Sequence, residues 1–162
     1  VLLGSFSKTV APGLRLGWLV GPKDMIANSW AYHDYTSIAA GMLSQYIAEI
    51  ALQSEKRQEI LSRNRKMLNE NLAAVKAWLN QYKDIFSYHE PNAGGMLFIK
   101  YDLDINSTEL ADWLRKEKSV FILAGDVYGM DRHFRIGIGE RKEYLIAGLD
   151  RIKEALIERF NL

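Results

Sequence analysis

The sequence predicts an α/β protein in which the last strands of a larger domain precede a small domain of sheet and flanking helices. Short apolar runs of strand length alternate with longer segments whose apolar residues recur at helical spacing, as in layered α/β domains. Residues 1–4 form a short apolar run that ends in glycine, and residues 14–21 are apolar on both faces; both runs predict buried strands. The sequence contains no further strands that would pair with these two. We therefore expect them to be the last strands of a larger parallel sheet.

After these strands, the first half of the chain is predicted to be helical. Pro22 favours a helix start, and apolar residues follow at helical spacing to about residue 32. Residues 32–36 are predicted to form a polar, aromatic break. Helical spacing then resumes over 37–52 and 54–81, which predicts two further helices.

The second half changes to strand patterning and then alternates with helices. The run Pro-Asn-Ala-Gly-Gly at 91–95 predicts a hairpin turn, since its glycines allow positive φ. Asn106 is expected to cap a helix that begins near Thr108. The expected strands are 85–89, 96–101, 119–123 and 133–138, and the expected helices are 108–117 and 140–160. We therefore assign residues 1–35 to the remnant of the larger domain, and residues 36–162 to the small domain with its long linking helix.

Composition excludes several classes of protein. The 162 residues carry 21 Lys and Arg against 20 Asp and Glu, so the net charge of +1 provides no basic field for nucleic acid. The chain has no cysteine, and its three histidines (His33, His89 and His133) are scattered, so no metal site is expected. No apolar run approaches the roughly 20 residues that span a bilayer. We expect a cytoplasmic protein without membrane or nucleic-acid partners, and, because the chain opens on Val1, one that lacks N-terminal sequence.

The turn between the first two strands holds a lysine followed by a hydroxyl residue, as a P-loop does. A P-loop also requires glycine immediately before the lysine and again five positions earlier. Those positions hold Ser7 and Leu2. This mismatch makes a nucleotide site of that type improbable.

Lys8 in this turn has the surroundings of a nucleophilic amine. A lysine attacks carbonyl groups when it is neutral, and burial and neighbouring cations such as Arg15 favour the neutral form. Arg15 could equally hold a phosphate, with further hydrogen bonds from Ser5 and Ser7. A Schiff-base lysine beside a phosphate clamp is what pyridoxal phosphate requires.

The segment SFSKTVAPGLRLGWLVGP resembles the cofactor-lysine segment of class I/II, fold type I pyridoxal-phosphate-dependent aminotransferases. The hairpin at 91–95 is similar to one in the small domain of that family. Residues 125–129 followed by 133–137 resemble its substrate-carboxylate segment. The resemblance implies that Lys8 holds pyridoxal 5′-phosphate and moves a proton during the reaction. It further implies that Ser5, Ser7 and Arg15 hold the cofactor phosphate, and that Arg135 pairs with the substrate α-carboxylate.

The resemblance also limits what this chain can do alone. In the family, the residues that contact the pyridine nitrogen and stack on the ring precede the lysine, and the sequence has no counterpart of them. We therefore expect the C-terminal part of a homodimeric aminotransferase that transfers the amino group of an α-amino acid to a 2-oxo acid, inactive by itself. The alternatives are a β-lyase or decarboxylase of the same fold, or a truncated, non-catalytic product.

Simpler interpretations of the candidate residues remain open. Lys8 could be a solvated loop lysine, and the two serines could be ordinary turn residues. Arg135 could be a structural arginine paired with Asp131 or Glu140. Tyr128 and His133 are expected to have packing roles.

Overall fold

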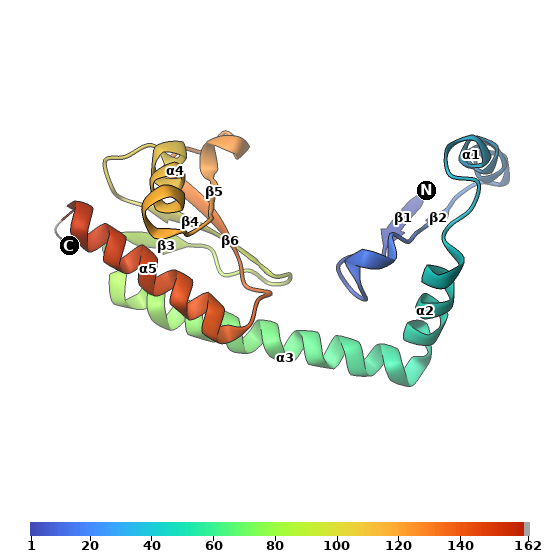
Figure 1. Ribbon diagram of the computed structural model, residues 1–162, viewed down its shortest axis with the longest axis horizontal. Coiled ribbons are helices and arrows are strands. Elements are labelled where there is room, and N and C mark those ends of the chain that lie inside the picture. Colours follow the sequence, from blue (N-terminus) through green and yellow to red (C-terminus); the bar gives the residue numbers. More distant parts are fainter. Residues whose placement is uncertain (161–162) are drawn as a thin grey trace. The chain divides into compact units, whose positions relative to one another are not determined.

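The protein is described by a computed structural model, which covers residues 1–160. The chain forms two compact units, Val1–Arg65 and Lys66–Leu162, which we call the N-terminal and C-terminal units (Figure 1). The long helix α3, Ser54–Leu79, begins in the first and ends in the second. None of the helices within residues 1–160 is both long and apolar enough to cross a membrane.

The N-terminal unit contains a two-stranded hairpin. Strand β1, Leu2–Ser5, pairs with β2, Gly17–Val20, and a short 3-10 helix, Pro12–Leu14, lies in the connection. The two predicted strands are confirmed, but the predicted burial is wrong, since Leu2 is 63% and Leu3 78% exposed. The pair is antiparallel rather than parallel. The apolar side chains of both strands remain largely exposed in this unit.

Two helices follow the hairpin. Helix α1 spans Lys23–Thr36 and α2 spans Met42–Leu52. The break predicted at 32–36 is wrong, because α1 continues to Thr36, whose hydroxyl donates to the carbonyl oxygens of the preceding turn. The chain leaves the helix at Ile38, which has a positive φ of 62°.

The C-terminal unit is built on a four-stranded antiparallel sheet. Its strands are β3, Phe86–Tyr88; β4, Met96–Tyr101; β5, Leu123–Ala124; and β6, His133–Gly137, in the spatial order β3-β4-β6-β5. The helices α4, Ser107–Lys118, and α5, Lys142–Phe160, accompany the C-terminal half of α3. Asn106 caps α4 as predicted, accepting hydrogen bonds from the backbone N–H groups of Thr108 and Glu109. The strand predicted at 119–123 is reduced to two residues at the edge of the sheet.

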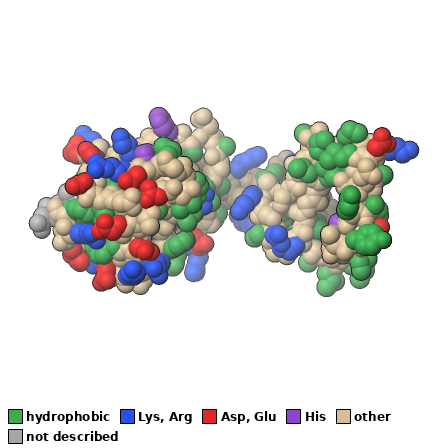
Figure 2. Space-filling view, turned by 90° about the horizontal axis from the view of Figure 1, so that it is seen from above, with side chains coloured by type: hydrophobic (Ala, Val, Ile, Leu, Met, Phe, Trp, Pro, Cys, Tyr) green, Lys and Arg blue, Asp and Glu red, His purple; other side chains and the backbone are tan. Residues whose placement is uncertain are grey.

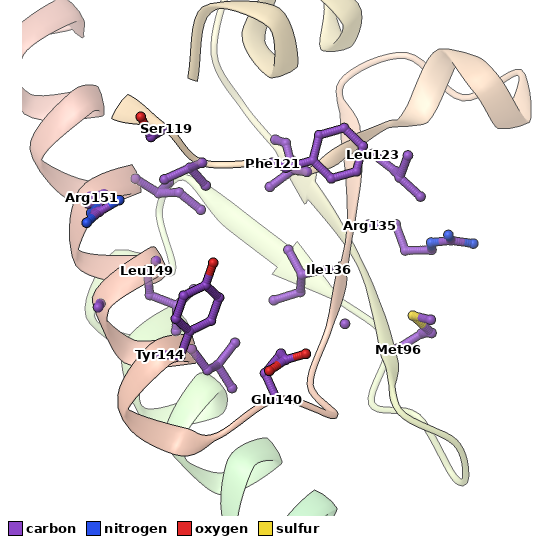
Figure 3. Close-up of a pocket in the computed structure, with 17 residues that line it drawn as sticks. Met96, Ser119, Phe121, Leu123, Arg135, Ile136, Glu140, Tyr144, Leu149 and Arg151 are labelled. Atoms are coloured by element: carbon purple, nitrogen blue, oxygen red, sulfur yellow. The ribbon is translucent and has the colours of Figure 1, made fainter. Parts of the chain in front are cut away.

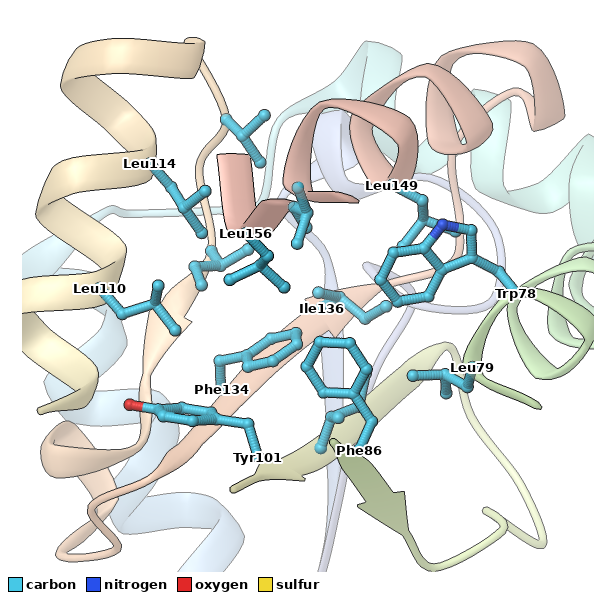
Figure 4. Close-up of a cluster of buried hydrophobic side chains, with 14 of the residues drawn as sticks. Trp78, Leu79, Phe86, Tyr101, Leu110, Leu114, Phe134, Ile136, Leu149 and Leu156 are labelled. Atoms are coloured by element: carbon cyan, nitrogen blue, oxygen red, sulfur yellow. The ribbon is translucent and has the colours of Figure 1, made fainter. Parts of the chain in front are cut away.

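One face of this sheet carries the hydrophobic core. Side chains alternate along a strand, so every second residue of β4 and β6 points to the same face. The inward set packs against the helices (Figure 4): Leu97, Ile99, Tyr101, Phe134, Ile136, Val75, Leu79, Leu110, Leu114, Leu149, Ile152 and Leu156. The intervening residues, among them Phe98 and Arg135, lie on the opposite face. This alternation places the predicted substrate arginine outside the core.

Candidate active site

The N-terminal unit brings four of the five predicted site residues to one end of the hairpin. Ser5 ends β1 and lies opposite Gly17 in the register of the two strands. Ser7 and Lys8 form the turn that follows, and Arg15 comes after the 3-10 helix, shortly before β2. All four residues therefore belong to the loop end of the β1–β2 hairpin.

Local hydrogen bonds fix the shape of this loop. The Phe6 carbonyl accepts from the backbone N–H groups of Thr9, Val10 and Ala11. The Ser7 N–H donates to Ser5 Oγ over 3.1 Å, and the two serine Oγ atoms are 3.0 Å apart. Both serines are thus turn residues, but each hydroxyl retains capacity for a further partner.

The two cations of the loop are exposed, and no carboxylate within residues 1–160 pairs with either of them. Arg15 adopts a left-handed backbone conformation with φ of 52°, and its Nη1 donates to the Pro12 carbonyl over 3.4 Å. Within residues 1–160, neither Lys8 nor Arg15 forms a salt bridge. The guanidinium and the two hydroxyls of this loop can donate hydrogen bonds to a phosphate. The lysine amine can form a covalent bond with a carbonyl group. The residues present therefore fit pyridoxal phosphate.

A pocket of about 430 Å³ lies beside the loop in the N-terminal unit. Ser5 and Phe6 line it from the hairpin, and Arg57 and Ile60 line it from α3. Lys8 and Arg15 are not part of its lining. From the sequence, Arg57 is expected to lie on a solvated helix face, because a charged residue on a helix gives no signal of the hairpin beside it; the structure places it in the lining of this pocket.

The fifth predicted residue, Arg135, lies on β6 in the C-terminal unit. It is half-buried, and Phe98 on β4 lies directly opposite in the strand register. The guanidinium carbon of Arg135 is 5.2 Å from the centre of the Tyr128 ring. No salt bridge within residues 1–160 involves Arg135, so neither Asp131 nor Glu140 is paired with it.

Asp131 is engaged elsewhere. Its Oδ1 accepts from the backbone N–H groups of Ser107 at 2.7 Å and Arg132 at 2.6 Å. These two hydrogen bonds, first that from Ser107, lower the pKa of the Asp131 carboxyl from its usual value, because they stabilise the charged form. The carboxylate therefore joins the start of α4 to the chain that enters β6.

Aromatic rings surround Arg135 on the outer face of the sheet. The Phe98 ring meets the Tyr128 ring edge-on at 5.7 Å between centres, and it stacks on the His133 ring at 5.1 Å. The packing roles expected for Tyr128 and His133 do not predict that they lie near Arg135. The sequence does indicate that His133 and Arg135 share a face of their strand, because they are two residues apart.

Arg135 also borders a pocket of about 480 Å³ (Figure 3). Phe121 and Leu123 line it from the edge of the sheet, and Tyr144 lines it from α5. Its walls are mainly apolar, with Arg135, Glu140 and Arg151 as charged members. Figure 3 shows the Arg135 side chain directed away from Tyr144 and α5.

Together, the lysine loop on a strand hairpin and the antiparallel sheet, whose Arg135 forms no ion pair within residues 1–160, define the C-terminal portion of a fold type I α/β protein. The family described as aminotransferase class I and II matches residues 1–152. The chain belongs to this family.

Individual relatives agree with the family. A PLP-dependent aminotransferase from Streptococcus suis has a TM-score of 0.88 and 32% identity, covering 96% of this chain and 41% of the other. The chain is 29% identical to an aspartate aminotransferase of Pyrococcus horikoshii over 96% of its length and 41% of the relative. It is also 28% identical to a Bacillus subtilis protein described as the uncharacterized HTH-type transcriptional regulator YdfD, over 96% of the chain and 32% of the relative.

The chain thus spans about two fifths or less of the length of these relatives. Pyridoxal phosphate is the cofactor of the enzymes that the family comprises. The predictions of the family, the fold and the cofactor are confirmed.

Proposed function

We propose that the protein is a pyridoxal-phosphate-dependent aminotransferase that transfers the amino group of an α-amino acid to a 2-oxo acid. The observation that carries the proposal is the lysine loop, where Lys8 and Arg15 are exposed beside the hydroxyls of Ser5 and Ser7 and form no ion pair with the described part of the chain. Free cations at a fixed loop favour an anionic ligand. In this proposal residues 1–35 belong to the cofactor-binding domain, and residues 36–162 to the small domain.

Each residue has a distinct task in the proposed site. Lys8 would hold the cofactor through a covalent bond from Nζ, and the same Nζ, released when the substrate amino group takes its place, would take the proton from Cα of the amino acid. Arg15 neutralises the phosphate charge, and the Ser5 and Ser7 hydroxyls donate to phosphate oxygens. The bound cofactor supplies an electron sink for the electrons that the proton leaves behind.

Arg135 is proposed to bind the α-carboxylate of the substrate. A planar guanidinium offers parallel N–H groups to a carboxylate, a geometry that lysine does not reproduce. Because no aspartate or glutamate within residues 1–160 occupies those N–H groups, they are free for a ligand.

We further propose that the protein acts as a homodimer. Helix α2 carries an exposed apolar stripe at helical spacing, formed by Met42, Leu43, Tyr46 and Ile47. Figure 2 shows apolar side chains gathered on the N-terminal unit, where charges are sparse. Contiguous apolar patches on a protein surface mark interaction sites, and a second copy would cover this one. Sedimentation analysis at several concentrations tests this, and a strictly monomeric protein would contradict it.

The test of Lys8 uses the protein expressed from its complete gene. We expect borohydride reduction of the cofactor-loaded protein to leave the pyridoxyl group on the peptide that contains Lys8, as measured by mass spectrometry. In Lys8→Ala this adduct should be lost and amino transfer should fall by several orders of magnitude. Lys23→Ala, which removes another exposed lysine of the same unit, is the matched control. An adduct that persists in Lys8→Ala refutes the assignment.

The regulator among the relatives supports a second candidate, a protein that keeps the cofactor site for regulation. In that case the Lys8 adduct forms, but amino acids are not converted to 2-oxo acids.

A β-lyase would release ammonia, and a decarboxylase would release carbon dioxide. Product analysis with one set of amino acids separates these outcomes.

A further inference from the structure

Arg135 is oriented by an aromatic ring rather than by a carboxylate. Its guanidinium carbon lies 5.2 Å from the centre of the Tyr128 ring, within the range of about 6 Å over which cation–π attraction acts. Within residues 1–160 the guanidinium forms no ion pair. The ring of Tyr128 is therefore the contact that restrains the head of this side chain.

The Tyr128 ring contacts the Phe98 ring, which in turn stacks on the ring of His133. Phe98 meets Tyr128 at an interplanar angle of 84°, and His133 stacks on Phe98 at 13°. His133 Nδ1 lies 2.8 Å from the Asp131 carbonyl oxygen, which fixes the imidazole. Phe98 and His133 belong to adjacent paired strands, so the row of rings rests on the sheet.

The backbone below Tyr128 is equally constrained. Tyr128 ends a 3-10 helix, Gly125–Tyr128, and Gly129 follows with a positive φ of 70°. A Cβ at Gly125 would lie 2.0 Å from the Met130 carbonyl oxygen, so this turn closes tightly only with glycine. Asp126 ties the turn to α4, since its N–H donates to Ser107 Oγ at 3.0 Å.

An aromatic ring and a carboxylate engage a guanidinium in different ways. A ring attracts the guanidinium charge without acting as a conventional oxygen acceptor, whereas a carboxylate binds along the guanidinium edge through two parallel N–H groups. Tyr128 can thus restrict the rotamers of Arg135 without consuming the donors that a ligand needs. A carboxylate partner would have taken those donors.

We infer that Tyr128 is a positioning residue for Arg135, and that the row His133, Phe98 and Tyr128 holds the guanidinium ready to bind the substrate carboxylate. The inference rests on the proposed role of Arg135. Restraining the arginine before binding reduces the entropy lost when the amino acid binds. The benefit should appear in substrate binding and not in the proton transfer at Lys8.

The experiment measures KM and kcat of the cofactor-loaded protein with L-leucine, L-phenylalanine and L-aspartate as amino donors. Tyr128→Leu should raise KM for all three donors by about 3- to 10-fold with kcat nearly unchanged, since they share the α-carboxylate. Tyr128→Phe keeps the ring and should retain the original KM. Phe98→Leu should raise KM in the same direction by a smaller factor.

Two controls separate the outcomes. Tyr35→Leu changes a tyrosine of the N-terminal unit that is 94% exposed and lines neither of the two pockets described above, so it should leave both constants unchanged. If Arg135→Ala leaves KM unaltered, the proposed role of Arg135 fails, and the inference fails with it. If Arg135→Ala raises KM while Tyr128→Leu does not, the inference alone is overturned. An equal rise in Tyr128→Phe and Tyr128→Leu also overturns it, because the hydroxyl would then be the active part.

Discussion

At the scale of single residues, Asn71 shows how a polar side chain secures the segment that follows β6. It is 1% exposed, and its Nδ2 donates to the carbonyl oxygens of Ile138 at 2.8 Å and Glu140 at 2.7 Å. Helix α3 is thereby joined to the chain just beyond the strand that carries Arg135. A buried amide of this kind specifies one arrangement of the two segments, because a shifted arrangement would leave buried carbonyls without donors.

We expect Asn71→Leu to lower the free energy of unfolding by about 2–4 kcal/mol, since it leaves two acceptors without a donor. Asn69→Leu, at an exposed position of the same helix, should change it by less than about 0.5 kcal/mol. Urea denaturation followed by circular dichroism measures both. Equal effects of the two substitutions would show that the Asn71 hydrogen bonds contribute little.

At the scale of elements, the long periodic segments could be predicted from the sequence and the short ones could not. Strands β3, β4 and β6 and the helices of the C-terminal unit follow from local apolar spacing. Strand β5 could not be bounded, because its length depends on which residues pair with β6, a contact between distant segments. The end of α1 was missed because Tyr32 to Thr36 have middling helix propensities and no breaker.

In the candidate site, too, residues that are close in the sequence could be predicted together, and residues brought together by strand pairing could not. Lys8, Ser5, Ser7 and Arg15 lie within eleven residues of one another, so the sequence alone brought them together. The cluster of Phe98, Tyr128 and Arg135 depends on the register of β4 against β6. That register is set by tertiary packing and has no local signature.

Asp131 provides an element-level prediction about pH, because it links α4 to the loop before β6. Its pKa is lowered in the folded protein by the N–H groups of Ser107 and Arg132. A depressed pKa gives stability that is present above the unfolded value of about 3.9 and is lost as the pH falls through the folded value. The free energy of unfolding should therefore decline below about pH 4 more steeply in the original protein than in Asp131→Asn. Parallel acid profiles of the two proteins would contradict this contribution.

At the scale of the whole molecule, the two units differ in how much apolar surface they bury. Among residues 1–65, all of which the structure describes, the buried apolar residues are Leu14, Ala48 and Ala51. The C-terminal unit instead has a continuous core that joins its sheet to α3, α4 and α5 (Figure 4). Since apolar burial is the main stabilising contribution to folding, the C-terminal unit holds most of the stability of this chain.

This difference predicts unequal hydrogen exchange in two antiparallel strand pairs of one molecule. Amides of β4 and β6, whose side chains enter the core, should exchange at least about 100-fold more slowly than amides of β1 and β2, because exchange there requires the core to open. Mass spectrometry of peptic peptides from the chain measures both pairs in one sample.

Equal protection would mean that the hairpin opens only together with the core, and that the lysine loop is as firmly held as Arg135. Unequal protection would mean that, in this chain, the proposed cofactor residues lie on the less stable unit and the proposed substrate residue on the more stable one. Cofactor binding to residues 1–65 would then slow exchange in β1 and β2 while leaving β4 and β6 unchanged.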